Sequence, residues 1–383
     1  MKKLLVVHNF YQNFGGEDSN IYEELGILGK QYEVEFFSVK NQNKSSLFSI
    51  IGLLTRSNYK VNNELAKLLD RFEPDAIYIH NIWFTVNLGI FRILKKRNIK
   101  VFLKIHNFRY ECSRYFFSKN HLNEQLTCYA CGFDRENTLF YNKYFSESYL
   151  KSFLLCFFSK KYFKILKHYP LTIILINNFH QAKMLNLGIP KEKITVINNP
   201  INLDKEPILR KDNTIIYAGR LSEEKGLKEL IEAWIDVRLE DYELLIIGDG
   251  ILRGYLENKY TNHNISFLGF LPNDEVMKYI AKASAVVTAT KLYEGQPRLL
   301  CEASALGTLS IYPSFGGMDE FFPEGYEFSF KQFEYEDLKE KLLLIKDINA
   351  VNRSTKKLLE HTNNIFDSSK FFNNFNNLFD KTF

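Results

Sequence analysis

The 383-residue sequence contains no apolar run that reaches the ~18 uncharged residues needed to cross a bilayer. It begins MKKLLVVHNF, where His8 and Asn9 interrupt the apolar run too early for a signal-peptide core, so we expect a first β-strand there. Cysteine is scarce, with five residues, and without an export signal this favours a reducing cytoplasm. No fixed-period repeat is present, which excludes a solenoid. With 45% hydrophobic and 25% charged residues, the composition excludes disordered and fibrous classes.

The charge is divided unevenly along the chain. Fifty Lys and Arg against 45 Asp and Glu give a net charge of +5. Residues 1–200 hold 28 basic and 16 acidic side chains (+12), and residues 201–383 hold 22 and 29 (−7), which together recover +5. This asymmetry suggests that the first half faces phosphates or an anionic membrane surface.

Short apolar runs rich in β-branched residues alternate with helical patterns, as in parallel βαβ units. At ~150 residues per domain, the length suggests two domains, and the runs form two successive sets. We therefore predict an α/β fold with two Rossmann-like domains that join near residues 198–211, where Pro200 and Pro207 interrupt a polar segment. The expected strands are 4–7, 33–39, 76–79, 101–105, 172–176 and 194–197, then 214–218, 243–247, 265–268, 285–288 and 309–312. The clearest helices are 21–28, 61–72, 182–187, 227–237 and 273–282.

The end of the chain, FFNNFNNLFDKTF, places phenylalanines at the spacing of one helical face on an Asn-rich background. Such a helix would be poor alone, so it must dock against another part of the chain.

The segment YEGQPRLLCEASALG, residues 293–307, predicts an anion site. Pro297 suits the first position of a helix, because its missing N–H would have no partner there. The amides of Arg298, Leu299 and Leu300 then point out of the helix start, where the helix dipole adds roughly half a positive charge.

Two glutamates flank this helix start. Glu294 precedes it, where the group attached to a bound phosphate would lie. Glu302 is one turn inside the helix on the face of Arg298, and its carboxylate can accept hydrogen bonds from two adjacent ribose hydroxyls. By their spacing alone, the two glutamates fit better as surface charges near a helix start.

Two further loops follow predicted strands, where parallel sheets bind ligands. In AGRLSEEKG, residues 218–226, Arg220 offers a planar fork and Lys225 a point charge that together suit a diphosphate. In NFGGEDSN, Gly15 and Gly16 allow the backbone to approach a phosphate or sugar closely. Taken alone, the first loop also fits solvated cations and the second an ordinary turn.

Read together, these residues resemble glycosyltransferase family 4, retaining enzymes of the GT-B fold. The resemblance covers nearly the whole chain, and each motif alone is weak evidence. The motifs are the early GG loop, PDAIYIHN (74–81), KIHNFR with His106, VINNP (196–200), GRLSEEKG, IIGDG (246–250), FLGF (267–270), the glutamates eight apart and FGGMDE (315–320). The sequence departs from the family at Asn198 and Pro200, and at Met318 and Asp319.

The resemblance implies the catalytic residues. Arg220 and Lys225 would hold the donor diphosphate and stabilise the leaving nucleoside diphosphate. Glu294 would orient the donor sugar, and His106 would lie beside that sugar at its reacting face. By itself, His106 fits equally well as a structural histidine at a strand end.

The resemblance also implies the donor-binding residues. Glu302 would hold the ribose, and the two glycines of the early loop would close over the sugar and phosphate. The donor-binding set is Gly15, Gly16, Gly295, Gln296, Pro297, Arg298, Leu299 and Glu302.

We expect no metal cofactor for transfer, because the chain has no Asp-x-Asp pair to bridge a diphosphate to a divalent ion. A separate zinc site is a second hypothesis, since Cys112, Cys128 and Cys131 could supply three ligands with a histidine as the fourth. Free structural thiols or a redox-sensitive pair are the alternatives.

Residues 141–170 contain six lysines, one glutamate and ten aromatic residues. A basic amphipathic stretch with aromatic anchors suits an anionic membrane surface, and a core-facing helix pair with solvated lysines is the alternative. We expect no nucleic-acid partner, since no recognition motif accompanies the charge.

The sequence thus predicts a cytoplasmic, metal-independent, retaining glycosyltransferase of hexosyltransferase type, peripheral on the inner face of the cytoplasmic membrane. It would transfer sugar from a nucleotide-sugar to a glycan or lipid-linked acceptor for surface polysaccharide or glycolipid synthesis. A sugar-nucleotide epimerase or hydrolase of the same fold, or a non-catalytic assembly scaffold, are the alternatives. We expect an acceptor-binding domain at 1–200 and a donor-binding domain at 201–365, their parallel sheets facing across a cleft, and a C-terminal helix at 366–383 that packs on the first domain.

Overall fold

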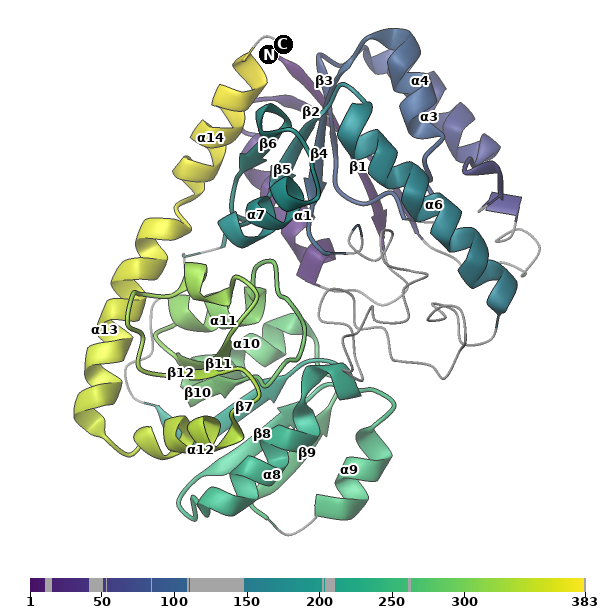
Figure 1. The fold of residues 1–383 in the computed structure, drawn as a ribbon. Helices are drawn as coiled ribbons and strands as arrows, with labels where there is room; N and C mark the ends of the chain where they lie inside the picture. The colour runs from purple at the N-terminus through teal and green to yellow at the C-terminus, as the bar shows by residue number, and fades with distance from the viewer. Residues whose placement is uncertain are drawn as a thin grey trace. The chain divides into compact units, whose positions relative to one another are not determined.

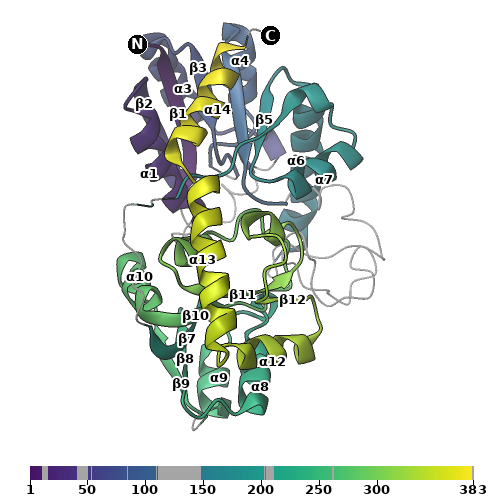
Figure 2. The ribbon, with the colours of Figure 1, turned by 90° about the vertical axis from the view of Figure 1, so that its left-hand side faces the viewer.

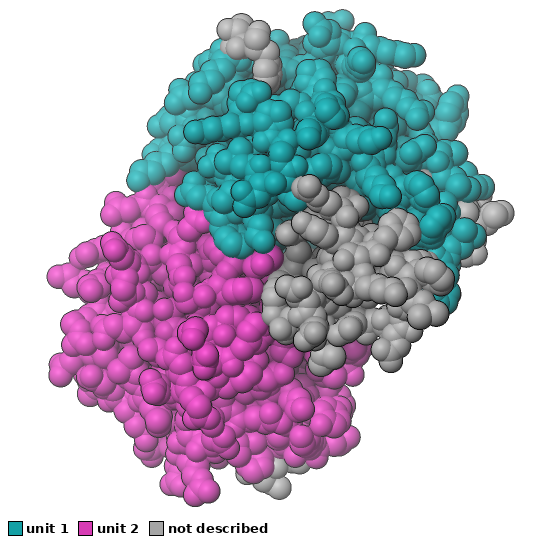
Figure 3. Space-filling view, in the orientation of Figure 1, with its two compact units in different colours: residues 1–200, 368–383 teal, residues 201–367 magenta. Residues whose placement is uncertain are grey.

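The computed structural model describes residues 1–10, 16–40, 51–52, 54–83, 85–108, 110, 148–201, 203, 211–260 and 263–381. The chain forms two compact units, coloured separately in Figure 3. Unit 1 comprises Met1–Pro200 and Ser368–Phe383, and unit 2 comprises Ile201–Asp367.

Unit 1 is built around a six-stranded parallel sheet in the order β2-β1-β3-β4-β5-β6. Its strands are β1 (Lys3–Phe10), β2 (Glu33–Lys40), β3 (Ala76–Ile79), β4 (Lys100–Ile105), β5 (Thr172–Leu175) and β6 (Ile194–Val196). Its helices are α1 (Gly16–Leu28), α3 (Tyr59–Phe72), α4 (Ile90–Arg97), α6 (Tyr149–His168), α7 (Asn178–Asn186) and α14 (Ser368–Asp380). The central strand β3 is buried along its whole length, as expected for a parallel strand covered on both faces.

Helices α1 and α14 lie on one face of this sheet, and α3, α4 and α6 lie on the other (Figures 1 and 2). Helix α14 is the expected C-terminal helix, and its docking on unit 1 confirms that prediction. Its Phe371, Phe375 and Phe379 are buried against the side chains of β1, β3 and β4. The Asn-rich helix is therefore held by burial of its one aromatic face.

Unit 2 repeats the architecture with strand order β12-β11-β10-β7-β8-β9, all parallel. Its strands are β7 (Asp212–Ala218), β8 (Glu243–Ile247), β9 (Ile265–Gly269), β10 (Ala283–Val287), β11 (Leu309–Ser314) and β12 (Ser329–Lys331). Its helices are α8 (Leu227–Val237), α9 (Arg253–Tyr260), α10 (Asn273–Lys282), α11 (Arg298–Ala305), α12 (Tyr335–Leu344) and α13 (Ile348–Ile365). The parallel α/β prediction is confirmed in both units.

The strand orders define where ligands bind. In unit 1 the chain runs from β1 outward to β2 and then returns to β3 on the other side of β1. In unit 2 it runs from β7 to β8 and β9 and returns to β10 beside β7. Open parallel sheets bind ligands at the carboxyl ends of strands where the direction reverses, which selects the loops after β1 and β3, and after β7 and β10.

Candidate functional site

The loops after β7 and β10 pack closely together in unit 2. Gly226 ends the first loop at φ +66°, and a Cβ there would lie 1.9 Å from the carbonyl oxygen of Ala289. The amide of Lys291 donates to the carbonyl of Glu224 over 2.9 Å. Glycine at 226 thus allows the basic loop to lie directly against the segment that leads to Glu294.

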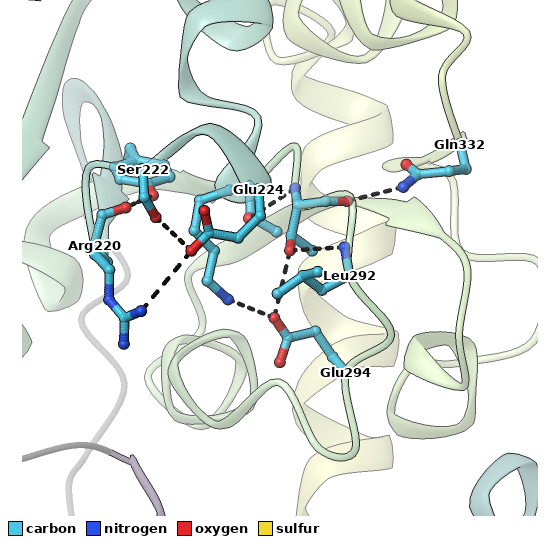
Figure 4. A network of polar contacts seen from close by, with 10 residues as sticks. Arg220, Ser222, Glu224, Leu292, Glu294 and Gln332 are labelled. Carbon is cyan, nitrogen blue, oxygen red and sulfur yellow. Dashed lines mark hydrogen bonds and ion pairs between the residues drawn. The ribbon is translucent and has the colours of Figure 1, made fainter. Parts of the chain in front are cut away.

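This approach brings two predicted site residues into contact. Lys225 donates from Nζ to Oε1 of Glu294 over 2.7 Å, and both side chains are about a quarter exposed. Thr290 supports the loop: its Oγ1 lies 3.5 Å from the same carboxylate oxygen and accepts from the amide of Leu292. Gln332 anchors Thr290 by donating to its carbonyl over 2.9 Å (Figure 4).

Arg220 lies in the same loop as Lys225 and projects toward solvent. Its side chain is 74% exposed, and Nη1 lies 3.8 Å from Oε1 of Glu224 (Figure 4). Ser222 donates to that same oxygen over 2.6 Å, and the hydroxyl of Tyr217 donates to the Arg220 carbonyl over 2.8 Å. The backbone of Arg220 is therefore fixed while its guanidinium stays accessible to an anion.

The helix start differs from the prediction by one residue. Pro297 is the N-cap, and α11 begins at Arg298. The amide of Arg298 donates to the carbonyl of Gln296 over 2.8 Å, so it does not point out of the helix start as expected. The first-turn donors left for an anion are the amides of Leu299 and Leu300.

Glu302 lies where the helical spacing placed it, on the same face as Arg298. The Nε of Arg298 donates to Oε1 of Glu302 over 2.8 Å, and Glu302 is 9% exposed. Gly295 and Gln296, in the loop before the helix, are buried. The predicted donor-binding residues of unit 2 thus lie together on one loop and one helix turn, next to the Lys225–Glu294 pair.

The FGGMDE motif supports this loop from the next strand, β11. Gly316 has φ +66°, and a Cβ there would lie 2.8 Å from Cα of Tyr293. The rings of Tyr293 and Phe315 stack with centroids 4.9 Å apart. Met318 is fully buried, and Asp319 accepts hydrogen bonds from Tyr312 and Ser314. The two departures from the family pattern in this motif are therefore residues that hold the local fold.

In unit 1, His106 follows β4 directly and is half-buried. Its Nε2 lies 3.0 Å from Nδ1 of His80, which follows β3, and the two rings stack. Burial lowers the pKa of each imidazole well below its usual value, and the Lys104 ammonium acts in the same direction. Both histidines are therefore neutral at pH 7.

His106 and His80 line a recess that opens to solvent at the carboxyl ends of β3 and β4. The recess is also lined by Glu17, Asn81, Trp83, Lys104, Ile105, Asn107, Tyr110 and Tyr162. Gly16 is the first residue of α1, immediately before Glu17. The recess thus lies where the strand order of unit 1 predicts a ligand.

The sequence reading missed a buried ionic cluster beneath this recess. Lys104 donates to Oε1 of Glu24 over 2.6 Å, and the hydroxyl of Tyr78 donates to Oε2 over 2.7 Å. The Lys104 and Glu24 side chains are at most 1% exposed. A signal was available, because Lys104 lies inside the apolar run 101–105, and a lysine in a strand buried on both faces requires a partner.

Several predicted features fall outside the described residues. These are Gly15, the cysteines Cys112, Cys128 and Cys131, and the first part of the aromatic segment, residues 141–147. The two described cysteines, Cys156 and Cys301, are buried free thiols.

The rest of the aromatic segment forms α6, whose outer face is exposed. Tyr149, Leu150, Phe153 and Phe157 are 40 to 58% exposed. The same face continues along the helix with three lysines at helical spacing, which are also exposed: Lys160, Lys161 and Lys164. We call these seven residues the α6 outer face. Within the described part of the chain, no helix has both the length and the apolarity to span a membrane.

Comparison with known proteins finds similarity in the second half of the chain. Residues 198–359 match the family described as glycosyl transferases group 1. The amylovoran biosynthesis glycosyltransferase AmsD of Erwinia amylovora is 27% identical over 140 residues, which are 36% of this chain and 40% of that protein. The chain thus spans about two fifths of the length of the curated relatives it matches first.

Two solved structures share the fold over nearly the whole chain. Sucrose-phosphate synthase from Thermosynechococcus elongatus has a TM-score of 0.71 at 14% identity, covering 99% of this chain and 98% of that one. Anabaena HepE, in complex with UDP and glucose, has a TM-score of 0.69 at 16% identity, covering 99% of each chain. Both likenesses concern the fold alone. The chain therefore has the GT-B fold, and its residues 198–359 are similar to the group 1 glycosyl transferases.

Proposed function

We propose that the protein is a retaining glycosyltransferase that moves a sugar from a nucleotide-sugar donor to a hydroxyl of a glycan or lipid-linked acceptor. The observation that carries the proposal is the 2.7 Å contact between Lys225 and Glu294 where the strand order of unit 2 reverses. A cation there meets a donor phosphate, and a carboxylate beside it accepts hydrogen bonds from sugar hydroxyls. The pair therefore suits the junction between diphosphate and sugar.

Each remaining group of unit 2 has a role in this proposal. Arg220, with its accessible guanidinium, joins Lys225 in binding the diphosphate and in stabilising negative charge as the nucleoside diphosphate leaves. The amides of Leu299 and Leu300 complete the anion site. Glu302 binds the ribose hydroxyls through its carboxylate, while Arg298 fixes its orientation.

Retention of configuration follows here from attack on the same face as the departing phosphate. A covalent glycosyl intermediate would need a carboxylate nucleophile, and we assign both Glu294 and Glu302 to binding. We therefore propose that the acceptor hydroxyl attacks directly and that a donor phosphate oxygen takes its proton. His106 contacts the transferred sugar, and unit 1 binds the acceptor.

The comparisons support a nucleotide-sugar donor and a polysaccharide product. A GT-B structure contains UDP and glucose, and AmsD is a glycosyltransferase of amylovoran biosynthesis. We propose that transfer needs no divalent metal, because Arg220, Lys225 and the start of α11 supply the positive charge that a metal would otherwise provide.

We also propose that unit 1 associates peripherally with the inner face of the cytoplasmic membrane through the α6 outer face. Aromatic rings at one end of this face suit the interfacial region of a bilayer, and the lysines that follow suit anionic head groups. A lipid-linked acceptor would then lie close to the enzyme.

A screen of nucleotide-sugars tests the proposed activity. The donor should raise the melting temperature of the protein by mass action, and the same donor should be turned over to a nucleoside diphosphate and a glycosylated acceptor, seen by mass spectrometry. Release of free sugar with no acceptor dependence would favour the epimerase or hydrolase alternative. Donor binding without turnover, under any acceptor tested, would favour the scaffold alternative.

A further inference from the structure

A series of neighbouring polar groups leads from the core of unit 1 to His106. At its buried end, Glu24 of α1 accepts from the ammonium of Lys104 over 2.6 Å and from the hydroxyl of Tyr78 over 2.7 Å. At its other end, His106 lines the open recess. His80 lies between them, fully enclosed, with one ring nitrogen facing each side.

The two nitrogens of His80 meet different partners. Its Nε2 makes no hydrogen bond to a described residue but has Oε2 of Glu24 3.6 Å away, and its Nδ1 lies at hydrogen-bond distance, 3.0 Å, from Nε2 of His106. A neutral imidazole carries one N–H and one lone pair, so only one of these sides can be a donor. Burial and the adjacent ammonium lower the pKa of both histidines, which keeps both rings neutral.

The carboxylate decides which nitrogen of His80 carries the proton. An N–H pointing at the negative Oε2 of Glu24 is attracted to it, whereas a lone pair pointing there is repelled. The proton of His80 therefore belongs on Nε2. Its Nδ1 is then an acceptor, and the 3.0 Å contact requires that His106 donates from Nε2.

We propose that Glu24, acting through His80, fixes His106 in the tautomer that carries its proton on Nε2 and leaves Nδ1 as a lone-pair acceptor for a substrate hydroxyl. Glu24 and His80 are thus positioning residues. The assignment of that hydroxyl to the transferred sugar rests on the proposed function, but the tautomer does not.

The other polar groups around this series leave the assignment intact. The rings of His8 in β1 and His80 lie edge to face with their centroids 6.2 Å apart. The Nε2 of His8 lies 2.8 Å from Oδ1 of Asp18 in α1. His180 of α7 acts on His106 only to lower its pKa further. Glu17 of α1 also lines the recess.

Nitrogen NMR of the full chain labelled with ¹⁵N-histidine tests the tautomer without any activity assay. The His106 signals, assigned by their loss in His106→Gln, should show the proton on Nε2 at neutral pH. The double variant Glu24→Gln/Lys104→Met removes both buried charges together and should give a mixture of tautomers. Tyr78→Phe removes a partner of Glu24 while keeping its charge, and it should leave the tautomer unchanged.

A proton on Nδ1 of His106 in the unaltered protein, or an unchanged tautomer in the double variant, would overturn the proposal. Because the first result needs no change at Glu24 or Lys104, instability of the double variant does not remove the test. In the transfer assay, the double variant should lose about tenfold in kcat/KM, the scale of one hydrogen bond, with unchanged affinity for the nucleoside diphosphate. If no donor is turned over, the proposed function fails while the NMR result still decides the tautomer.

Discussion

The ammonium of Lys225 lies 2.7 Å from the Glu294 carboxylate, so a residue proposed for the diphosphate and one proposed for the sugar are ion-paired to each other. The pair links two loops that are 69 residues apart in the sequence. In the proposed function, donor binding would redistribute this contact, since the ammonium would gain phosphate oxygens and the carboxylate would gain hydroxyls as partners.

Alanine at either cation should slow transfer strongly. Lys225→Ala and Arg220→Ala should each lower kcat by ~10² to 10³, because each removes a preorganised charge that stabilises the leaving diphosphate. Steady-state kinetics with the donor identified by the screen measures the loss. Lys228→Ala, which removes an exposed lysine one helical turn beyond Lys225, is the matched control and should retain activity. A loss below tenfold in both variants would contradict the assignment.

Chelation should leave transfer unaffected. If positive side chains and a helix start hold the diphosphate, EDTA should not change kcat or KM, and added Mg²⁺ or Mn²⁺ should not raise them. Loss of activity in EDTA that is restored by either ion would show that a divalent cation takes part.

Vesicle sedimentation tests the α6 outer face. The protein should bind vesicles that contain anionic lipid, less so in high salt, and should bind neutral vesicles weakly. Phe153→Ser/Phe157→Ser should weaken binding at least about tenfold, since two half-exposed rings leave the interface. Tyr59→Ser, at an 85% exposed aromatic residue of α3, should have no effect. Binding that ignores both salt and the double variant would count against this surface.

A buried histidine makes unit 1 sensitive to acid. His180 is fully buried between Phe108 and Tyr110, and burial lowers its pKa to about 3. Between pH ~6.5, the ordinary pKa of histidine, and that value, His180 is protonated in the unfolded chain but not in the folded one. The free energy of unfolding therefore keeps its full value above pH ~6.5 and falls as the pH drops below it. In His180→Phe, the free energy of unfolding should fall more slowly as the pH drops, by up to ~1.4 kcal/mol less per pH unit.

Urea unfolding midpoints at about pH 5 and about pH 7.5 measure the effect. The His180→Phe midpoint should change less between the two conditions than that of the unaltered chain. His168→Phe, at an exposed position at the end of α6, should leave the difference unchanged. Equal acid sensitivity in all three proteins would contradict the assignment.

The sequence predicted the parallel strands well, because strands such as AIYI, and ELLII after its first residue, are continuous apolar runs of the right length. It missed β12, whose three residues Ser329–Lys331 carry only one apolar side chain and owe their conformation to pairing with β11. Local pattern cannot reveal a strand whose stability comes from its neighbour.

In the candidate site, the sequence predicted contacts between residues of the same segment, but it did not predict contacts between distant segments. The Arg298–Glu302 pairing follows from a helical turn. The Glu24–Lys104 pair joins residues 80 apart, and the Lys225–Glu294 contact depends on Gly226 fitting against Ala289. Such contacts arise only when the sheet brings distant loops together.

The docking of α14 also determines which unit can be completed first while the chain is being translated. Lys2 and Asp380 form an ion pair, so the two ends of the described chain meet in unit 1, whereas unit 2 is one continuous segment. As the chain leaves the ribosome, unit 2 has all its residues before Phe371, Phe375 and Phe379 are synthesised. The aromatic face of unit 1 that these rings cover, including Tyr32 and Tyr78, therefore stays open until α14 has been synthesised.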